Sequence, residues 1–163
     1  MGISDHLSAA DVILDASVRN KRDLLEILAA EAARRLGHSK QEILDALQSR
    51  EELGSTALGK GVALPHAELP GIVPPIMLFA RLRRSIDFDA RDAEPVDLVF
   101  LVLWPAAATR RLLDAMSEIC RALRDPHLLR RLRLAETPED VAQILHHQEG
   151  FGAGRSACIP REK

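Results

Sequence analysis

The amino-acid sequence predicts a layered α/β domain, and three observations lead to this fold class. The chain of 163 residues is 47% hydrophobic and 28% charged, which is typical of one soluble globular domain with a proper core. Helical periodicity marks both ends of the chain, and short apolar runs bounded by glycine or proline lie between them. One such run, residues 96–104, is apolar almost throughout, as in a strand buried on both faces of a sheet.

The N-terminal part is predicted to form one strand and two helices. A β-like segment covers residues 12–18, and Asn20 can cap a helix in which leucine and alanine recur at helical spacing through residues 20–36. Gly37 is a suitable stop, because glycine adopts the left-handed conformation without strain. An S-x-x-E capping box then begins a second helix, residues 39–53, and the short link predicts that the two helices are neighbours.

The middle of the chain predicts three strands, at residues 61–66, 76–82 and 96–104. A double proline precedes the second, and Pro105 ends the third. The length of the third would also fit a buried helix, but its β-branched and aromatic residues favour a strand. Because it is apolar on both faces, we expect it at the centre of a sheet covered by helices.

The periodicity of the remaining chain predicts three helices, at residues 109–125, 126–134 and 138–147. Asp125 and Pro126 form an N-cap and N1 pair for the second of these helices. Residues 149–163 are rich in glycine and small polar residues and have no period. We therefore expect a single domain, residues 1–148, followed by a flexible tail, residues 149–163.

Charge and composition restrict the partners that we expect. The 22 basic and 24 acidic residues give a net charge of -2, so the balance gives no reason to expect nucleic acid. No apolar run approaches the roughly 18 residues that cross a bilayer, and no secretory signal is present. The two cysteines have no metal-binding spacing, and the acidic residues at 87–94 lack the pattern of a calcium loop. We expect a cytoplasmic protein without membrane insertion, without a metal site and without a cofactor.

The stretch 59-GKGVALPHAEL-69 contains the candidate reactive residue, His66. Pro65 fixes its own backbone and biases Leu64 toward an extended conformation, and the glycines upstream allow a sharp turn. An accessible imidazole with a pKa near ~6.5 is neutral often enough to act as a nucleophile. A lone histidine after a proline is more often structural, so the residue types alone leave both interpretations open.

If His66 accepts a phosphoryl group, the product carries about two negative charges and requires hydrogen-bond donors. The nearest candidates in the sequence combine hydroxyls, glycine-rich backbone and cations. This predicted phosphate-binding and support set is Arg50, Ser55, Thr56, Gly59, Lys60 and Gly61.

The run 50-REELGSTALGKGVALPHAEL-69 resembles the active-site signature of the enzyme IIA domains of the bacterial phosphotransferase system, fructose/mannitol class. The resemblance continues through residues 86–105 and 134–145, and it is greatest to the nitrogen-regulatory enzyme IIA. It implies a three-layer α/β/α sandwich around a small mixed sheet. It also implies that His66 takes phosphate from an HPr-like phosphocarrier protein, and that the phosphorylation state controls targets such as a sensor kinase or a potassium transporter.

Two positions depart from the pattern of this family. Leu112 stands where the family usually has a second, supporting histidine, and Glu68 places a negative charge close to His66. At ~6 Å and an effective dielectric of ~20 to ~80, the repulsion between Glu68 and a phosphoryl charge would be roughly 0.7 to 3 kcal/mol. Two alternatives therefore stay open: an enzyme IIA that passes phosphate to a sugar permease subunit, and a catalytically weakened binding module of the same fold.

Overall fold

The computed structural model of the chain describes residues 7–148. Residues 1–6 and the predicted tail, residues 149–163, lie outside this range. The strands of the described part are β1 (Val12–Ala16), β2 (Ala57–Gly59), β3 (Val62–Ala63), β4 (His66–Leu69), β5 (Ile76–Ile86) and β6 (Val96–Pro105). Its α-helices are α1 (Lys21–Leu36), α2 (Lys40–Glu52), α3 (Thr109–Ala122), α4 (Pro126–Leu134) and α5 (Pro138–His146).

The strands form one mixed sheet with β6 at its centre. The strand order is β1-β5-β6-β3-β2, and β4 also pairs with β6. β5 runs antiparallel to β6, whereas β3 and β4 run parallel to it. The central position predicted for residues 96–104 is thus confirmed, and β6 is buried at almost every position. The sequence of such a strand is apolar almost throughout, because helices cover both faces of the sheet and bury the side chains on each face.

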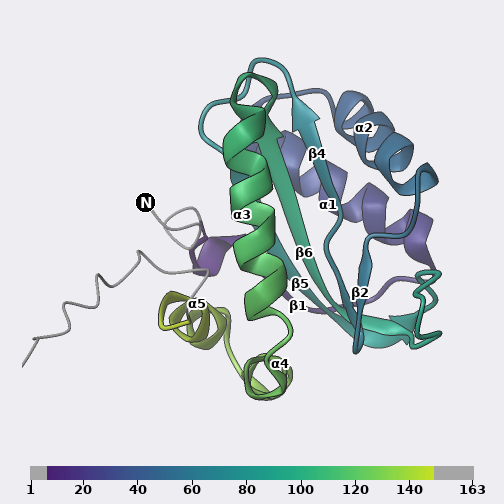
Figure 1. The fold of residues 1–163 in the computed structure, drawn as a ribbon, viewed down its shortest axis with the longest axis vertical. Coiled ribbons are helices and arrows are strands. Elements are labelled where there is room, and N and C mark those ends of the chain that lie inside the picture. The colour runs from purple at the N-terminus through teal and green to yellow at the C-terminus, as the bar shows by residue number, and fades with distance from the viewer. Residues whose placement is uncertain (1–6, 149–163) are drawn as a thin grey trace, which may run out of the picture.

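Helices cover the two faces of the sheet and create two hydrophobic cores. Phe100 and Val102 of β6 pack into the core that α3, α4 and α5 close. Leu101 and Leu103 point the other way, into the core that α1 and α2 close. Figure 1 shows this arrangement, with α3 crossing one face of the sheet and α1 lying behind the other. The predicted three-layer α/β/α sandwich around a small mixed sheet is confirmed.

The helix ends follow the local sequence. The Asn20 side chain accepts a hydrogen bond at the start of α1, and Gly37 ends this helix in the left-handed conformation at φ +61°. The Asp125 side chain caps α4 in the same way as Asn20 caps α1. At α2, the Ser39 hydroxyl accepts from the Glu42 N–H, which is the Ser39 half of the predicted capping box. Short-range capping chemistry therefore fixes most helix starts.

The strands differ from the prediction at three places. The predicted strand at 61–66 is two strands, β3 and β4, because Pro65 has no N–H to continue a ladder. The chain keeps the same neighbour through this break, since the Pro65 carbonyl accepts from the Val102 N–H at 3.0 Å. β5 extends four residues past Leu82, and its added part is largely solvent-exposed. β2 is too short to show a period, and the sequence did not predict it.

Candidate functional site

His66 is the first residue of β4, at the carboxyl end of the central strand. It lies opposite Val102 in the parallel pairing of β4 with β6. Its side chain is half-buried, whereas Ala67 and Leu69 point into the core beneath α1 and α2. The pairing with β6 and the adjacent Pro65 hold the backbone of His66 in place, so the ring has a defined position at the edge of the sheet.

Both ring nitrogens of His66 have partners, and these partners assign the tautomer. Nδ1 lies 2.9 Å from the carbonyl oxygen of Leu64, which can only accept, so Nδ1 carries the proton. Nε2 lies 3.2 Å from Nε of Arg50, which can only donate, so Nε2 presents its lone pair. The ring is therefore neutral, and Nε2 is its nucleophilic atom.

The electrostatics of the site favour the same neutral form. Burial lowers the pKa of His66 below its ordinary value of 6.5, and the positive charge of Arg50 lowers it further. The hydrogen bond to the Leu64 carbonyl and the charges of Glu51 and Glu68 act in the opposite direction, and the net pKa is lowered.

Arg50 reaches His66 from the last turn of α2, a helix that packs against β4. Its Nη1 donates to the Gly54 carbonyl at 3.0 Å while its Nε donates to His66. The guanidinium is thus held between the end of its own helix and the imidazole. A planar guanidinium in this position can donate hydrogen bonds to the Nε2 lone pair of His66 and to the oxygens of a phosphoryl group.

Glu51 anchors the same end of α2. Its carboxylate accepts from the Thr56 N–H at 3.0 Å and from the Thr56 hydroxyl at 2.6 Å. It also accepts from Lys21 Nζ at 2.9 Å, which ties α1 to α2. Only 7% of the Glu51 side chain is exposed, so these bonds lie in a poorly hydrated place where they are strong. The anchored helix end is the one that carries Arg50.

The hydroxyls of the predicted set are occupied by other partners. The Ser55 hydroxyl donates to the Phe88 carbonyl and accepts from the Ala57 N–H. Thr56 is buried and its hydroxyl donates to Glu51. In this structure both side chains hold the segment after α2 in place, and neither forms a hydrogen bond with His66.

Gly59 ends β2, and Lys60 and Gly61 form the turn to β3, which lies toward the other end of the central strand. Val62 pairs with Leu98, whereas His66 pairs with Val102. Four residues of β6 separate these levels, which is about 13 Å at the rise of a strand. Of the predicted phosphate-binding and support set, Arg50 alone forms a hydrogen bond with His66 in the described part of the chain.

The two positions that depart from the family pattern have different surroundings. Leu112 is 6% exposed and packs in the core that α3 closes over the sheet. Glu68 is exposed and follows His66 by two residues, so both side chains project from the same face of β4. Position 112 therefore provides no imidazole to assist His66, and the carboxylate of Glu68 lies close to His66.

Two contributors to the site escaped the reasoning from sequence. The Leu64 carbonyl fixes the tautomer, and Glu51 anchors the helix end behind Arg50. Pro65 was the available signal for the first, because it restricts the backbone of Leu64. Glu51 follows Arg50 in the quoted signature run, but its bonds to Thr56 and Lys21 could not be predicted from that pattern.

The acidic segment before β6 uses its carboxylates within the protein. Asp92 accepts from the Lys60 and Glu94 N–H groups, and these bonds lower the pKa of Asp92. Asp87 accepts from the Asp89 N–H. Among residues 7–148 no group of three or more His, Cys, Asp or Glu side chains is arranged to hold a metal ion.

A family model described as "Phosphoenolpyruvate-dependent sugar phosphotransferase system, EIIA 2" matches residues 5–148 of the chain. The match includes every strand and helix described above as well as His66 and Arg50. The chain belongs to this EIIA family. Within the described part of this EIIA chain, no helix has both the length and the apolarity to cross a membrane.

Proteins similar to this EIIA chain include nitrogen regulatory proteins. It is 42% identical over 146 residues to the nitrogen regulatory protein of Bradyrhizobium diazoefficiens. The matched region covers 89% of this chain and 95% of the relative. It is 38% identical over 133 residues to that of Escherichia coli K12, covering 81% and 82% respectively. The solved IIA-Ntr from Neisseria meningitidis superimposes with a TM-score of 0.83 at 32% identity, over 87% of this chain and 97% of that one.

Proposed function

We propose that this EIIA protein accepts a phosphoryl group on Nε2 of His66 from an HPr-like phosphocarrier and acts as a nitrogen-branch regulator. The observation that carries the proposal is the pair of bonds on the ring: Leu64 holds the proton on Nδ1, and Nε2 keeps its lone pair next to Arg50. A half-buried neutral imidazole in this tautomer is ready to attack an electrophile without first losing a proton.

The transfer balances without an additional base. The lone pair of Nε2 forms a new P–N bond while the P–N bond to the histidine of the carrier breaks, and that electron pair returns to the carrier's imidazole. Nδ1 of His66 keeps its proton, so positive charge develops on the ring. The Leu64 carbonyl, which accepts from Nδ1 at 2.9 Å, stabilises this charge.

Arg50 has two successive roles in this proposal. Its Nε–H occupies the Nε2 lone pair at rest, so it must release the lone pair before the attack. Because Nη1 stays bonded to the Gly54 carbonyl, a short swing is sufficient to direct the guanidinium at the incoming phosphoryl oxygens. It then offsets the repulsion between the phosphoryl group and Glu68.

The nitrogen-regulatory role is proposed from the relatives. The first six curated relatives are nitrogen regulatory proteins or a homologue of one, while a relative named as a fructose-specific EIIA component matches at 37% over 102 residues. In this role the phosphorylation state of His66 changes the binding of target proteins, such as a sensor kinase or a potassium transporter. Phosphate is not passed on to a sugar.

Phosphorylation is tested by incubating the protein with labelled phosphoenolpyruvate, enzyme I and an HPr-like carrier. We expect a label that is lost in acid and retained in base, as for phosphohistidine. The label disappears in His66→Ala and persists in the matched control His127→Ala, whose imidazole lies exposed at the start of α4. Label on both variants would place the phosphohistidine elsewhere.

A second candidate, a binding module without phosphoryl transfer, is favoured by the packing of Leu112 in the core. This module predicts that wild-type protein stays unlabelled although circular dichroism shows it folded. The outcome of the labelling reaction separates the two candidates directly.

The sugar-transport alternative differs from the proposal in the recipient of the phosphate. The solved mannitol IIA of Escherichia coli was captured with its phosphorylated IIB partner, which is the behaviour expected of a transport component. Labelled protein is mixed with a purified IIB subunit, and in parallel its binding to a sensor kinase and a potassium transporter is measured. Regulation predicts binding that changes with phosphorylation, and rapid transfer of label to IIB would contradict it.

A further inference from the structure

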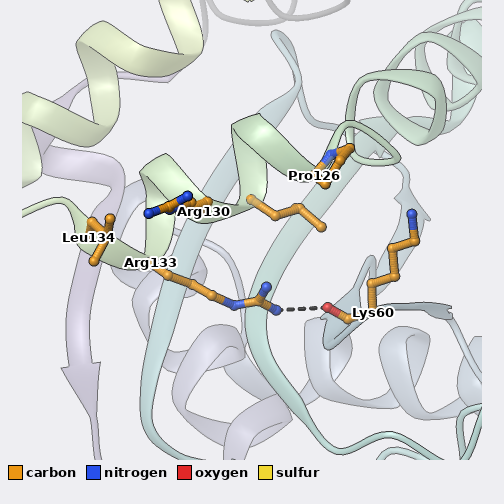
Figure 2. A pocket seen from close by; sticks show the side chains of 6 residues that line it. Lys60, Pro126, Arg130, Arg133 and Leu134 are labelled. Carbon is orange, nitrogen blue, oxygen red and sulfur yellow. Dashed lines mark hydrogen bonds between the residues drawn. The ribbon is translucent and has the colours of Figure 1, made fainter.

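A hollow on the surface of α4 lies apart from His66. It has a volume of about 410 Å³. We call it the α4 hollow. The residues that line it are Lys60, Pro126, Leu129, Arg130, Arg133 and Leu134. Figure 2 shows how α4 and the turn between β2 and β3 form its two sides, with Arg133 reaching from the helix to the backbone of Lys60. The proposed phosphorylation uses none of these residues.

The wall opposite α4 is rigidly built. Arg133 donates twice to Asp97, at 2.9 and 2.8 Å, and once to the Lys60 carbonyl at 2.7 Å. Asp92 holds the Lys60 N–H from the other side at 2.9 Å. Gly61 has φ +81°, and a Cβ there would lie 2.6 Å from the Arg133 guanidinium, so glycine permits this close approach. The backbone of Lys60 is therefore held in place on both sides, and its exposed side chain projects from this fixed turn.

Two cations at the rim have no carboxylate partner among residues 7–148. Lys60 and Arg130 are both exposed, and neither forms an ion pair or side-chain hydrogen bond within the described part of the chain. Arg133, by contrast, is neutralised by Asp97. Helix α4 carries three arginines and no acidic residue, although the whole chain has a net charge of -2. The positive charge is thus concentrated at this surface.

The lining between these cations is apolar. Pro126, Leu129 and Leu134 contribute it, and Leu134 remains 68% exposed. An exposed leucine beside unpaired cations is typical of the centre and rim of a protein interface. A small anion would require converging polar groups to orient it, whereas Lys60 and Arg130 are exposed at the rim and Arg133 is already paired with Asp97.

The geometry points to a docking site for an acidic segment of a partner protein, one that places an apolar side chain in the α4 hollow. Its carboxylates pair with Lys60 and Arg130, and its leucine or phenylalanine packs on Leu129 and Leu134. The site is about 13 Å or more along the sheet from His66, so a target can dock there in either phosphorylation state of His66.

The test uses a short fluorescein-labelled peptide in which glutamates flank a central Leu-Phe pair. We expect binding by anisotropy, with amide shifts in ¹⁵N-labelled protein confined to α4 and residues 59–61. Lys60→Glu combined with Arg130→Glu raises Kd roughly 10-fold or more, and higher salt weakens the binding. Lys40→Glu, a reversal of an exposed lysine on the opposite helix layer, leaves Kd unchanged.

Control peptides separate the parts of the proposal. A peptide with serines in place of the Leu-Phe pair binds more weakly, and one with lysines in place of the glutamates does not bind. Failure of the acidic peptide to bind, or equal binding of the lysine peptide, overturns the proposal. The proposal is also overturned if single-stranded RNA or phosphatidylserine vesicles change the amide chemical shifts of α4 and the acidic peptide does not.

The docking site and the proposed phosphorylation can be tested independently of each other. Arg130→Glu retains the phosphoenolpyruvate-dependent label on His66, and His66→Ala retains the affinity for the peptide. Circular dichroism of both variants verifies that the fold is intact.

Discussion

The imidazole of His66 carries the proposed chemistry, and three neighbours decide its state. Leu64 fixes the proton, Arg50 faces the lone pair, and Glu68 supplies a competing negative charge. Burial outweighs the factors that raise the pKa, so the neutral ring is the resting form. A single substitution can measure the contribution of Arg50 or of Glu68, whereas Leu64 acts through its backbone carbonyl.

The rate of phosphorylation should depend on pH through His66. Because its pKa in the folded protein is lowered from 6.5, the neutral nucleophile persists to lower pH than in a free histidine. We expect the rate to be level at neutral pH and to fall only as pH drops through this lowered pKa. NMR titration of the His66 ring should give a midpoint below 6.5, and a midpoint at or above 6.5 would contradict the role of burial.

Arg50 should accelerate phosphoryl transfer to His66, because its planar guanidinium can donate several N–H groups to the phosphoryl oxygens. Arg50→Ala is expected to lower the rate of phosphorylation roughly 10- to 1,000-fold, because the donor to the developing phosphoryl charge is lost. Arg50→Lys keeps the charge but loses the planar geometry, so its rate should lie between the two. Single-turnover labelling measures these rates, with Arg22→Ala on the exposed face of α1 as the matched control. Equal rates for Arg50→Ala and wild type would remove Arg50 from the site.

Helix α4 depends for its position on one side chain from the sheet. Arg81 of β5 donates from Nη1 to the carbonyls of Leu132, Arg133 and Ala135, at 3.1, 3.3 and 2.6 Å. These carbonyls belong to the C-terminal end of α4, where helix carbonyls lack partners within the helix. A half-buried arginine thus caps the helix that also forms the α4 hollow.

Removal of this cap should destabilise the protein. Arg81→Met leaves the partly buried carbonyls of Leu132 and Ala135 without this donor, and we expect the free energy of unfolding to fall by roughly 1 to 3 kcal/mol. Urea denaturation monitored by circular dichroism measures the change, and the m-value should not alter. Arg84→Met, at an exposed position of the same strand, should change stability by about 0.5 kcal/mol or less. Equal effects of the two substitutions would contradict the capping role.

The whole molecule is organised around β6, which separates two cores and leads from the α4 end of the sheet to the His66 end. The proposed phosphorylation site and the α4 hollow occupy different ends of this strand. The members of both cores that the structure describes lie between Leu7 and Leu145. The single domain proposed at residues 1–148 therefore includes all of them.

Shortening the chain after Gln148 should preserve both fold and reaction. We expect Tm to stay within about 2 °C of the full chain, because no described core residue is removed. Labelling of His66 should proceed at the same rate. Differential scanning calorimetry and the labelling assay check these points. A large decrease in Tm would show that residues 149–163 contribute to the folded domain.

The sequence by itself predicted the helices, the central strand and the candidate reactive residue. Capping residues and periodicity are local properties, so Asn20, Gly37 and Asp125 predicted their helix ends, and the apolar run of β6 predicted its central place. Pro65 marked the position of His66 because a proline restricts the backbone on both sides of it.

The tertiary structure alone decided which of the candidates meet His66. Lys60 is six residues from His66 in the sequence, but an extended chain carries it away along the sheet. Arg50 is sixteen residues away, yet the packing of α2 against β4 returns it to within 3.2 Å. Separation along the chain does not report distance in space, because strand register and helix packing depend on contacts between distant segments.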